Sequence, residues 1–172
     1  ADRELVGRVL RRLAEVVAER GPRFAEARAG GLESYRRADG GCGSEPRVVL
    51  LLDGFHAFRQ TAETFGAASP FEALGDIMRS GRSVGVHVVI TCDRPAAIPS
   101  SLTAALPLQF VLRLTNPHDY DHIGVDRDAF EEAPPGRAIA AGDGREIQFA
   151  LVGGHGELAA QAAEVDALAR DL

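Results

Sequence analysis

The sequence predicts an α/β protein with parallel central strands. Three short runs, 47–53, 86–91 and 108–114, are rich in Val, Leu and Ile, which is typical of strands covered on both faces in a parallel sheet. Helical spacing of apolar residues returns between these runs, over 69–81 and 100–105. Strands that alternate with helices in this way favour a parallel sheet flanked by helices.

A helical lead-in precedes the first strand. Apolar residues recur at helical spacing over residues 2–20, and we expect Gly21 and Pro22 to end this helix. We therefore divide the chain into a helical lead-in and linker, residues 1–46, and one domain, residues 47–172.

A hairpin is predicted near the C-terminus. Two runs, 137–141 and 146–152, flank Asp143 and Gly144, and Asp-Gly is a strong signal for a tight turn between antiparallel strands. We expect these strands to lie at the edge of the sheet. A terminal helix is expected over 157–172.

Composition limits the classes of function. The chain has 172 residues, 45% of them hydrophobic, which suits one domain with a single core. Its longest apolar run, 48–52, is far too short to cross a bilayer, so we expect a cytoplasmic segment without membrane contact. The formal net charge of −6 argues against DNA binding by this chain alone, because duplex binding depends on neutralising phosphates. Cys42 and Cys92 form no CxxC pattern, and reduced thiols are expected.

Asp53 ends the first apolar strand and is followed by Gly54. In open α/β sheets, ligands bind outside the carboxyl ends of the strands, so an aspartate there faces the crevice. In P-loop NTPases this is the Walker-B position, whose aspartate holds the Mg²⁺ that bridges the phosphates. The alternative is that Asp53 only opens a turn that Gly54 completes.

The wider pattern resembles a known family. The segments 82–90, 91–95, 106–114 and 135–138 follow one another as in the FtsK/SpoIIIE family of P-loop ATPases, in the actinobacterial branch that includes EccC of type VII secretion. The resemblance covers about residues 47–152. It implies a RecA-like P-loop NTPase core, ATP and Mg²⁺ as cofactors of the complete domain, and a role in moving DNA or secreted protein.

The resemblance also implies roles for individual residues. Asp53 would be the catalytic Walker-B aspartate and would hold Mg²⁺ through the nucleotide, and Thr91 and Arg94 would lie near that nucleotide. Arg82 would be an arginine that acts in trans on the nucleotide of a neighbouring subunit. The alternative for both arginines is a solvated side chain that caps a helix or pairs with Asp93.

Several family features are missing. All 19 basic residues are arginines, and the chain contains neither a lysine nor a GxxxxGK[ST] phosphate loop, which in the family would lie before Ala1. Gly54 stands where active members carry an acid, and glycine cannot act as a base. Cys92 aligns with a sensor threonine, and Asp121 aligns with a frequent arginine. We therefore expect a degenerate domain that binds neither ATP nor Mg²⁺ as this chain alone.

Other chemistry-bearing residues have simpler interpretations. His87 lies in an apolar strand, so a buried, hydrogen-bonded histidine is expected. The segment 116–122 holds two histidines and two aspartates, but its spacing predicts a turn and the start of a helix instead of a metal site. His56 could share a site with Asp53 only if the turn between them is helical. A response-regulator receiver is excluded because that fold needs a lysine.

Two functions remain. The first is a module of an FtsK/SpoIIIE-like translocase, with other ATPase domains of the same protein or a homo-oligomeric ring as partners, and with secreted protein or DNA as cargo. The second is a non-hydrolysing interaction module that binds a secretion substrate or regulates a neighbouring ATPase domain. Gly54 favours the second for this domain.

Overall fold

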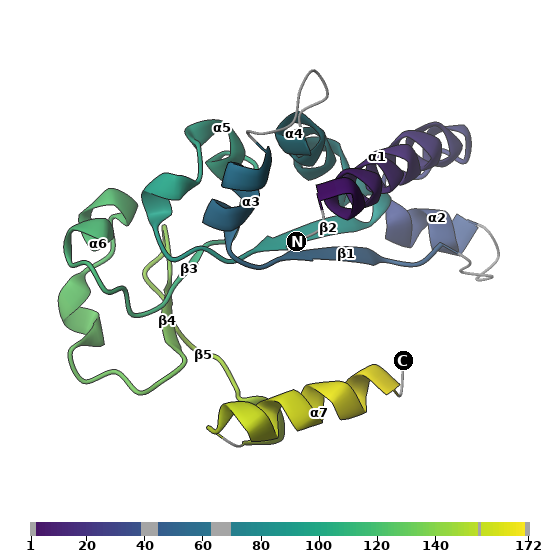
Figure 1. Cartoon of the computed structure of the whole chain (residues 1–172). Helices are drawn as coiled ribbons and strands as arrows, with labels where there is room; N and C mark the ends of the chain where they lie inside the picture. Colours follow the sequence, from purple (N-terminus) through teal and green to yellow (C-terminus); the bar gives the residue numbers. More distant parts are fainter. Residues whose placement is uncertain (1–2, 39–44, 63–69, 155, 171–172) are drawn as a thin grey trace. The chain divides into compact units, whose positions relative to one another are not determined.

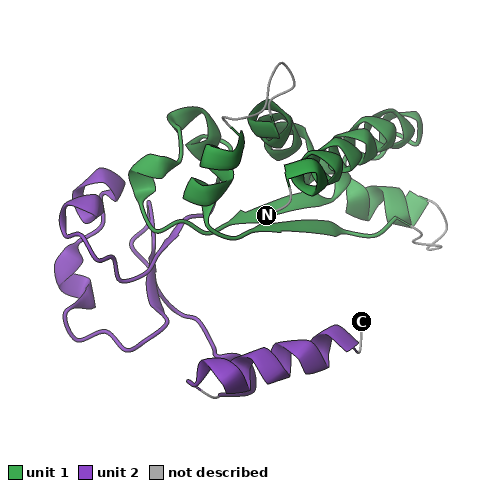
Figure 2. Cartoon of the chain, in the orientation of Figure 1, with its two compact units in different colours: residues 1–107 green, residues 108–172 purple. Residues whose placement is uncertain are grey.

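The computed structural model describes residues 3–38, 45–62, 70–154 and 156–170, and Cys42 lies outside them. The chain forms two compact units, residues 1–107 and 108–172 (Figure 2). Each unit has a hydrophobic core of its own. The predicted boundary near residue 46 stays a prediction.

Unit 1 carries its helices on one side of two parallel strands (Figure 1). In chain order its elements are α1 (Arg3–Glu26), α2 (Leu32–Ala38), β1 (Val48–Leu52), α3 (Phe55–Ala62), α4 (Pro70–Ser80), the 3₁₀ turn η1 (Arg82–Val84), β2 (Val86–Ile90), the 3₁₀ turn η2 (Pro95–Ala97) and α5 (Ser100–Thr103). The predicted strands and helices of this region are confirmed, and α3 was not predicted.

The two strands pair in parallel over their full length. Val48 lies opposite Val86 and Leu52 opposite Ile90. One face of the pair packs on the core, which includes Leu74 and Ile77 of α4. The core also takes in Leu10, Phe24 and Leu32 from the lead-in helices. The lead-in and the strands therefore share one hydrophobic core.

The other face of the strands is not covered as expected. Val49, Leu51 and Val89 are between 50% and 73% exposed. The prediction of strands covered on both faces is wrong for these residues, because within unit 1 the helices pack on one side only. A run of apolar residues does not by itself tell a covered face from a bare one.

The first helix does not end at Gly21 and Pro22. Both lie inside α1, which continues to Glu26. Proline weakens a helix because it removes a backbone donor. Here the turn beyond it is held by tertiary contact: Phe24 is buried, and its ring stacks on Tyr35 of α2 with centroids 4.2 Å apart. The prediction of a helix end was wrong because packing outweighs local propensity at this point.

Unit 2 contains an antiparallel sheet. Its elements are β3 (Phe110–Val111), α6 (His118–Ile123), the 3₁₀ turn η3 (Arg127–Phe130), β4 (Arg137–Ala140), β5 (Glu146–Gln148), the 3₁₀ turn η4 (Val152–Gly154) and α7 (Leu158–Arg170). The strand order is β3-β4-β5, with Phe110 opposite Ala140 and Ala138 opposite Ile147. The hairpin and the terminal helix are confirmed. The expectation that the hairpin lies at the edge of the parallel sheet is wrong, because β4 and β5 pair with β3 in a separate sheet.

The third predicted strand differs from expectation. Only Phe110 and Val111 of the run 108–114 form β3, and β3 pairs antiparallel with β4. Val111 points into a small core with Tyr120, Phe130 and Ile139. Beyond the strand, Arg113 donates to the carbonyls of Phe130 (2.5 Å) and Ala133.

No helix of the described ranges is both long and apolar enough to span a membrane.

A clash at Gly85 gives a test of the packing between the lead-in and β2. Gly85 has a φ of +79°, and a Cβ there would lie 2.4 Å from Cδ2 of Leu32. Gly54 has a similar φ of +74° but meets nothing within 4 Å. We expect Gly54→Ala to lower the free energy of unfolding by about 1–2 kcal/mol, through backbone strain alone. Gly85→Ala should cost about 1–3 kcal/mol more, since Leu32 must move.

Chemical denaturation of the two variants beside the parent chain measures this difference. Equal losses for the two glycines would show that α2 does not pack on this turn.

Candidate functional site

The parallel register brings two polar residues together at the carboxyl end of the strands. Leu52 and Ile90 are the last paired residues, so Asp53 and Thr91 come next, side by side. The ladder continues past the strands: the Thr91 amide donates to the Leu52 carbonyl (3.0 Å), and the Phe55 amide donates to the Thr91 carbonyl (2.9 Å). Backbone hydrogen bonds therefore fix the positions of both side chains.

Asp53 and Thr91 are hydrogen-bonded to each other. The Thr91 hydroxyl donates to Oδ1 of Asp53 at 2.5 Å, and the Gly54 amide donates to the same hydroxyl oxygen at 2.9 Å. Both side chains are exposed. Oδ2 of Asp53 accepts no hydrogen bond from the residues that the structure describes. One carboxylate oxygen is thus fixed and the other is open to a ligand.

This arrangement fits a hard cation that takes one carboxylate from the protein and its other ligands from phosphates and water. Mg²⁺ is usually bound through one or two carboxylates together with substrate phosphates and water. Asp53 supplies one such carboxylate, and Thr91 orients it. Within the described ranges, no group of three or more His, Cys, Asp or Glu side chains lies close enough to form a metal centre. Asp53 is the residue that would hold Mg²⁺, which would supply positive charge to neutralise phosphate oxygens.

The residues directly after Asp53 and Thr91 supply no carboxylate. Gly54 follows Asp53 in a left-handed conformation, so the position next to the carboxylate carries no side chain. Cys92 follows Thr91, is half-buried, and its thiol contacts the Arg94 carbonyl at 3.3 Å. Burial raises the pKa of the Cys92 thiol, and the nearby charge of Asp93 adds to that effect. The thiol therefore stays protonated near neutral pH.

Arg94 and Asp93 do not form the predicted alternative pair. Both are exposed, and neither side chain has a hydrogen bond or ion pair with any residue in the described part of the chain. Arg94 is followed by the turn η2, whose Ala97 amide donates to the Arg94 carbonyl. Arg94 therefore lies two residues beyond Cys92 with its side chain free to meet a ligand.

Arg82 lies at the opposite end of β2. It opens the turn η1, four residues before Val86, whereas Thr91 comes directly after Ile90. A strand of this length spans roughly 16 Å at about 3.3 Å per residue. The structure thus places Arg82 at the end of β2 remote from Asp53 and Thr91, and its predicted role in trans stays a prediction. A ligand held by Asp53 is beyond the reach of Arg82 in the same unit.

A cavity of about 450 Å³ lies beside Arg82. Its lining includes Glu33, Arg47, Arg79 and His87. Arg47 pairs with Glu33 at 2.6 Å and Arg79 with Asp76 at 2.5 Å. Arg82 is exposed and has no side-chain partner among the described residues. The cavity therefore presents one unpaired guanidinium among three arginines.

Sequence reasoning missed the other residues of this cavity. The parallel register would have shown part of it, because Arg47 precedes β1 at the position that faces Gly85. The approach of Glu33 depends on the direction in which the turn between α1 and α2 sends the chain, and Gly30 and Gly31 mark a turn there without giving its direction.

His87 differs from expectation in two respects. Its ring is half-buried and lines the cavity, and it makes no hydrogen bond within the described ranges. The prediction of a buried, hydrogen-bonded histidine is wrong because β2 has a helix-covered face and a bare face, and the cavity reaches the start of the strand.

His56 and the segment 116–122 lie in local structure outside the Asp53–Thr91 pair. His56 shares a hydrogen bond with Gln60 in α3 (3.2 Å), and Asp53 and Gly54 lie before that helix, so the turn between Asp53 and His56 is not helical. The segment 116–122 forms a turn and the start of α6, as predicted, with the His118 amide donating to the Asn116 side chain at 3.2 Å.

Unit 2 has a cavity of its own, of about 460 Å³. Asp128, Glu131, Glu132 and Arg137 line it. None of the predicted site residues takes part, and the lining is mainly acidic. This cavity is therefore unsuited to phosphate.

No model of a known protein family matches the chain. Individual relatives do match. The chain is 30% identical to the ESX-1 secretion system protein EccCb1 of Mycolicibacterium smegmatis over 113 residues, which cover 60% of this chain and 18% of that protein. It is also 30% identical to the ESX-4 secretion system protein EccC4 of Mycobacterium tuberculosis over 156 residues, 88% of this chain and 12% of that protein. The chain thus spans less than a fifth of the length of these curated relatives.

Solved structures agree with this relationship. A structure of Thermomonospora curvata EccC, described as ATPases 2 and 3 in complex with a signal sequence peptide, matches with a TM-score of 0.62 and 27% identity. The match covers 81% of this chain and 25% of that one. The chain is therefore a homologue of the EccC proteins, the FtsK/SpoIIIE-like ATPases of type VII secretion, and has the α/β fold of their P-loop ATPase domains.

Proposed function

We propose that this chain is the Walker-B part of an ATPase domain in a translocase, and that it presents Asp53 to its own nucleotide and Arg82 to the nucleotide of a neighbouring domain. The observation that carries the proposal is the carboxylate at the end of β1, which Thr91 fixes through one oxygen and leaves open at the other. Such a group suits Mg²⁺ bound with ATP phosphates. Thr91 and Arg94 complete the nucleotide side of the crevice.

The distance between Arg82 and Asp53 supports a role in trans. An arginine in an oligomeric ATPase stabilises the charge of phosphoryl transfer in the adjacent subunit. Arg82 is exposed, has no side-chain partner in the described ranges, and lies at the end of β2 remote from Asp53. The partners would be other ATPase domains of the same protein or further copies of it, in the cytoplasm.

A second function is supported by Gly54. With glycine and no acid after Asp53, the domain would be degenerate in hydrolysis. It would then act as an interaction module that binds a secretion substrate or regulates a neighbouring ATPase domain. The related EccC structure with a signal sequence peptide favours secreted protein over DNA as the cargo, as does the net charge of −6.

The 172-residue chain should not hydrolyse ATP by itself. It contains no phosphate-loop lysine, and Gly54 cannot polarise a water molecule. Phosphate release measured with Mg²⁺ should match that of Asp53→Ala, whose fold should persist because Asp53 is exposed. Turnover that Asp53→Ala abolishes would contradict the proposed degeneracy.

In the full-length protein, Asp53→Ala should remove Mg²⁺-dependent nucleotide binding at this domain. Titration with a fluorescent ATP analogue, with Mg²⁺ and with EDTA, measures the effect. Asp93→Ala is the matched control, because Asp93 is an exposed aspartate near the same crevice without a partner in the described ranges. If Asp53→Ala and Asp93→Ala behave alike and Mg²⁺ has no effect, the interaction module is the function.

Arg82→Ala should reduce ATP hydrolysis only in assemblies that contain a competent neighbouring domain. Removing an arginine of this kind lowers kcat by on the order of 10³-fold or more. Arg79→Ala is the control, since it removes an arginine from the same cavity that is already paired with Asp76 in an exposed ion pair. The rate of mixed assemblies is compared with that of the competent domain alone. An equal loss for both arginines would rule out a specific role of Arg82.

A further inference from the structure

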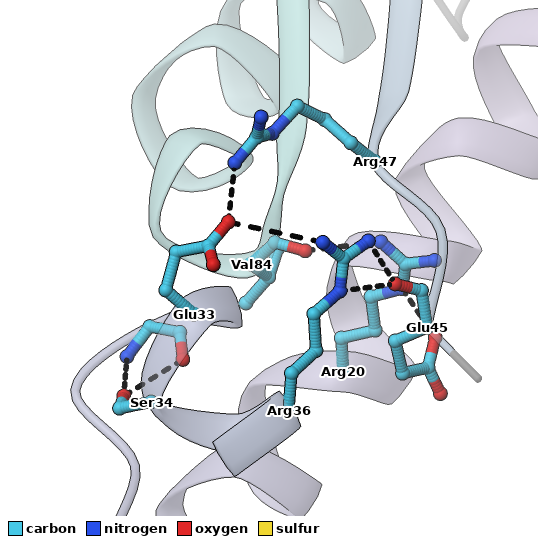
Figure 3. Close-up of polar contacts among 8 residues, drawn as sticks. Arg20, Glu33, Ser34, Arg36, Glu45, Arg47 and Val84 are labelled. Carbon is cyan, nitrogen blue, oxygen red and sulfur yellow. Dashed lines mark hydrogen bonds and ion pairs between the residues drawn. The ribbon is translucent and has the colours of Figure 1, made fainter. Parts of the chain in front are cut away.

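Arg20 is the one buried charged side chain of the described residues, with 5% exposure. It lies on α1, in the lead-in, which takes no part in the proposed function. Its Nε pairs with Oε2 of Glu45 at 3.0 Å, and its Nη1 donates to the Val84 carbonyl at 3.0 Å (Figure 3). A single guanidinium thus ties the lead-in helix both to the segment before β1 and to the turn before β2.

Glu45 is held from several directions. Its carboxylate also pairs with Arg23 at 2.5 Å. Its carbonyl accepts two hydrogen bonds from Arg36, at 3.0 and 2.7 Å (Figure 3). The Glu45 side chain is only 12% exposed. A carboxylate fixed in this way gives Arg20 a rigid partner, so Arg20 has little freedom to move away from Val84.

The Val84 carbonyl belongs to the turn that carries Arg82. Val84 is buried, two residues after Arg82, and closes the turn η1 with its amide on the Gly81 carbonyl at 3.0 Å. Leu32 of α2 also packs on this turn, against Gly85. Arg20 therefore holds the inner side of the turn whose outer side exposes Arg82.

The contribution of a buried ion pair to the free energy of unfolding is a weak reason for a protein to keep a charge such as Arg20. Replacing a buried ion pair with apolar residues of similar volume is often neutral or stabilising, whereas buried ionic groups in some proteins specify one geometry. Arg20 fixes a backbone carbonyl through a directional donor, which an apolar side chain could not do. The contact thus specifies the direction in which the turn presents Arg82.

We propose that Arg20 is a positioning residue, which orients the Arg82 turn so that Arg82 meets the phosphate of a nucleotide bound by a neighbouring domain. The inference rests on the proposed function of Arg82. Arg20 itself is buried. It acts through the Val84 carbonyl.

The test uses the full-length protein with Arg20→Met, which keeps most of the side-chain volume and removes the donors. We expect kcat for ATP hydrolysis in assemblies to fall by about 10²-fold, with KM little changed. This is the loss expected when a catalytic group is misplaced. In an Arg82→Ala background, Arg20→Met should have no further effect, because Arg20 acts through Arg82. Arg23→Met, which removes the other partner of the Glu45 carboxylate but no contact with the turn, is the matched control and should retain kcat.

Hydrogen exchange of residues 81–86 provides a readout that does not depend on activity. These amides should exchange faster in Arg20→Met than in the parent or in Arg23→Met, and Arg20→Lys should restore part of the protection. Unchanged exchange would overturn the inference, as would an equal loss of kcat from Arg20→Met with and without Arg82. Arg82→Ala without effect on hydrolysis would instead count against the proposed function, and exchange would still decide whether Arg20 holds the turn.

Discussion

The parallel ladder between β1 and β2 is the constraint on which the site depends. Five paired residues, from Val48 opposite Val86 to Leu52 opposite Ile90, fix the positions of the residues at both ends of the strands. At the carboxyl end the ladder sets Asp53 against Thr91, and at the other end it sets Arg47 against the turn that carries Arg82. Asp53 and Arg82 therefore lie at opposite ends of one short sheet. The covered face of that sheet supplies the core that keeps the ladder in place.

Much of unit 1 and of the crevice could be predicted from the sequence because its signals are local. The runs that became β1 and β2 are rich in Val, Leu and Ile, and Asp53 is the first polar residue after β1. Ligands bind outside the carboxyl ends of the strands in open α/β sheets, so the position of Asp53 could be predicted from its place in the sequence. Arg82 could be singled out only from its setting in a family pattern.

The parts that were missed depend on tertiary contact. Nothing in the local sequence tells that α1 passes through Pro22, because the contact that holds it there is the stack of Phe24 on Tyr35. The bare face of Val49, Leu51 and Val89 has the same composition as the covered one. Likewise, the run that holds β3 gives no sign that it joins an antiparallel sheet, since that depends on its partner β4.

The length of β1 and β2 has a consequence for how this sequence can vary. Inserting or deleting one residue within either strand would shift the register and turn the later side chains to the opposite face. Leu50 and Leu52 would leave the core, and Asp53 would lose its place against Thr91 in the same event. Length changes in these strands should therefore be excluded during divergence, even where the identity of the exposed residues Val49, Leu51 and Val89 is free to drift.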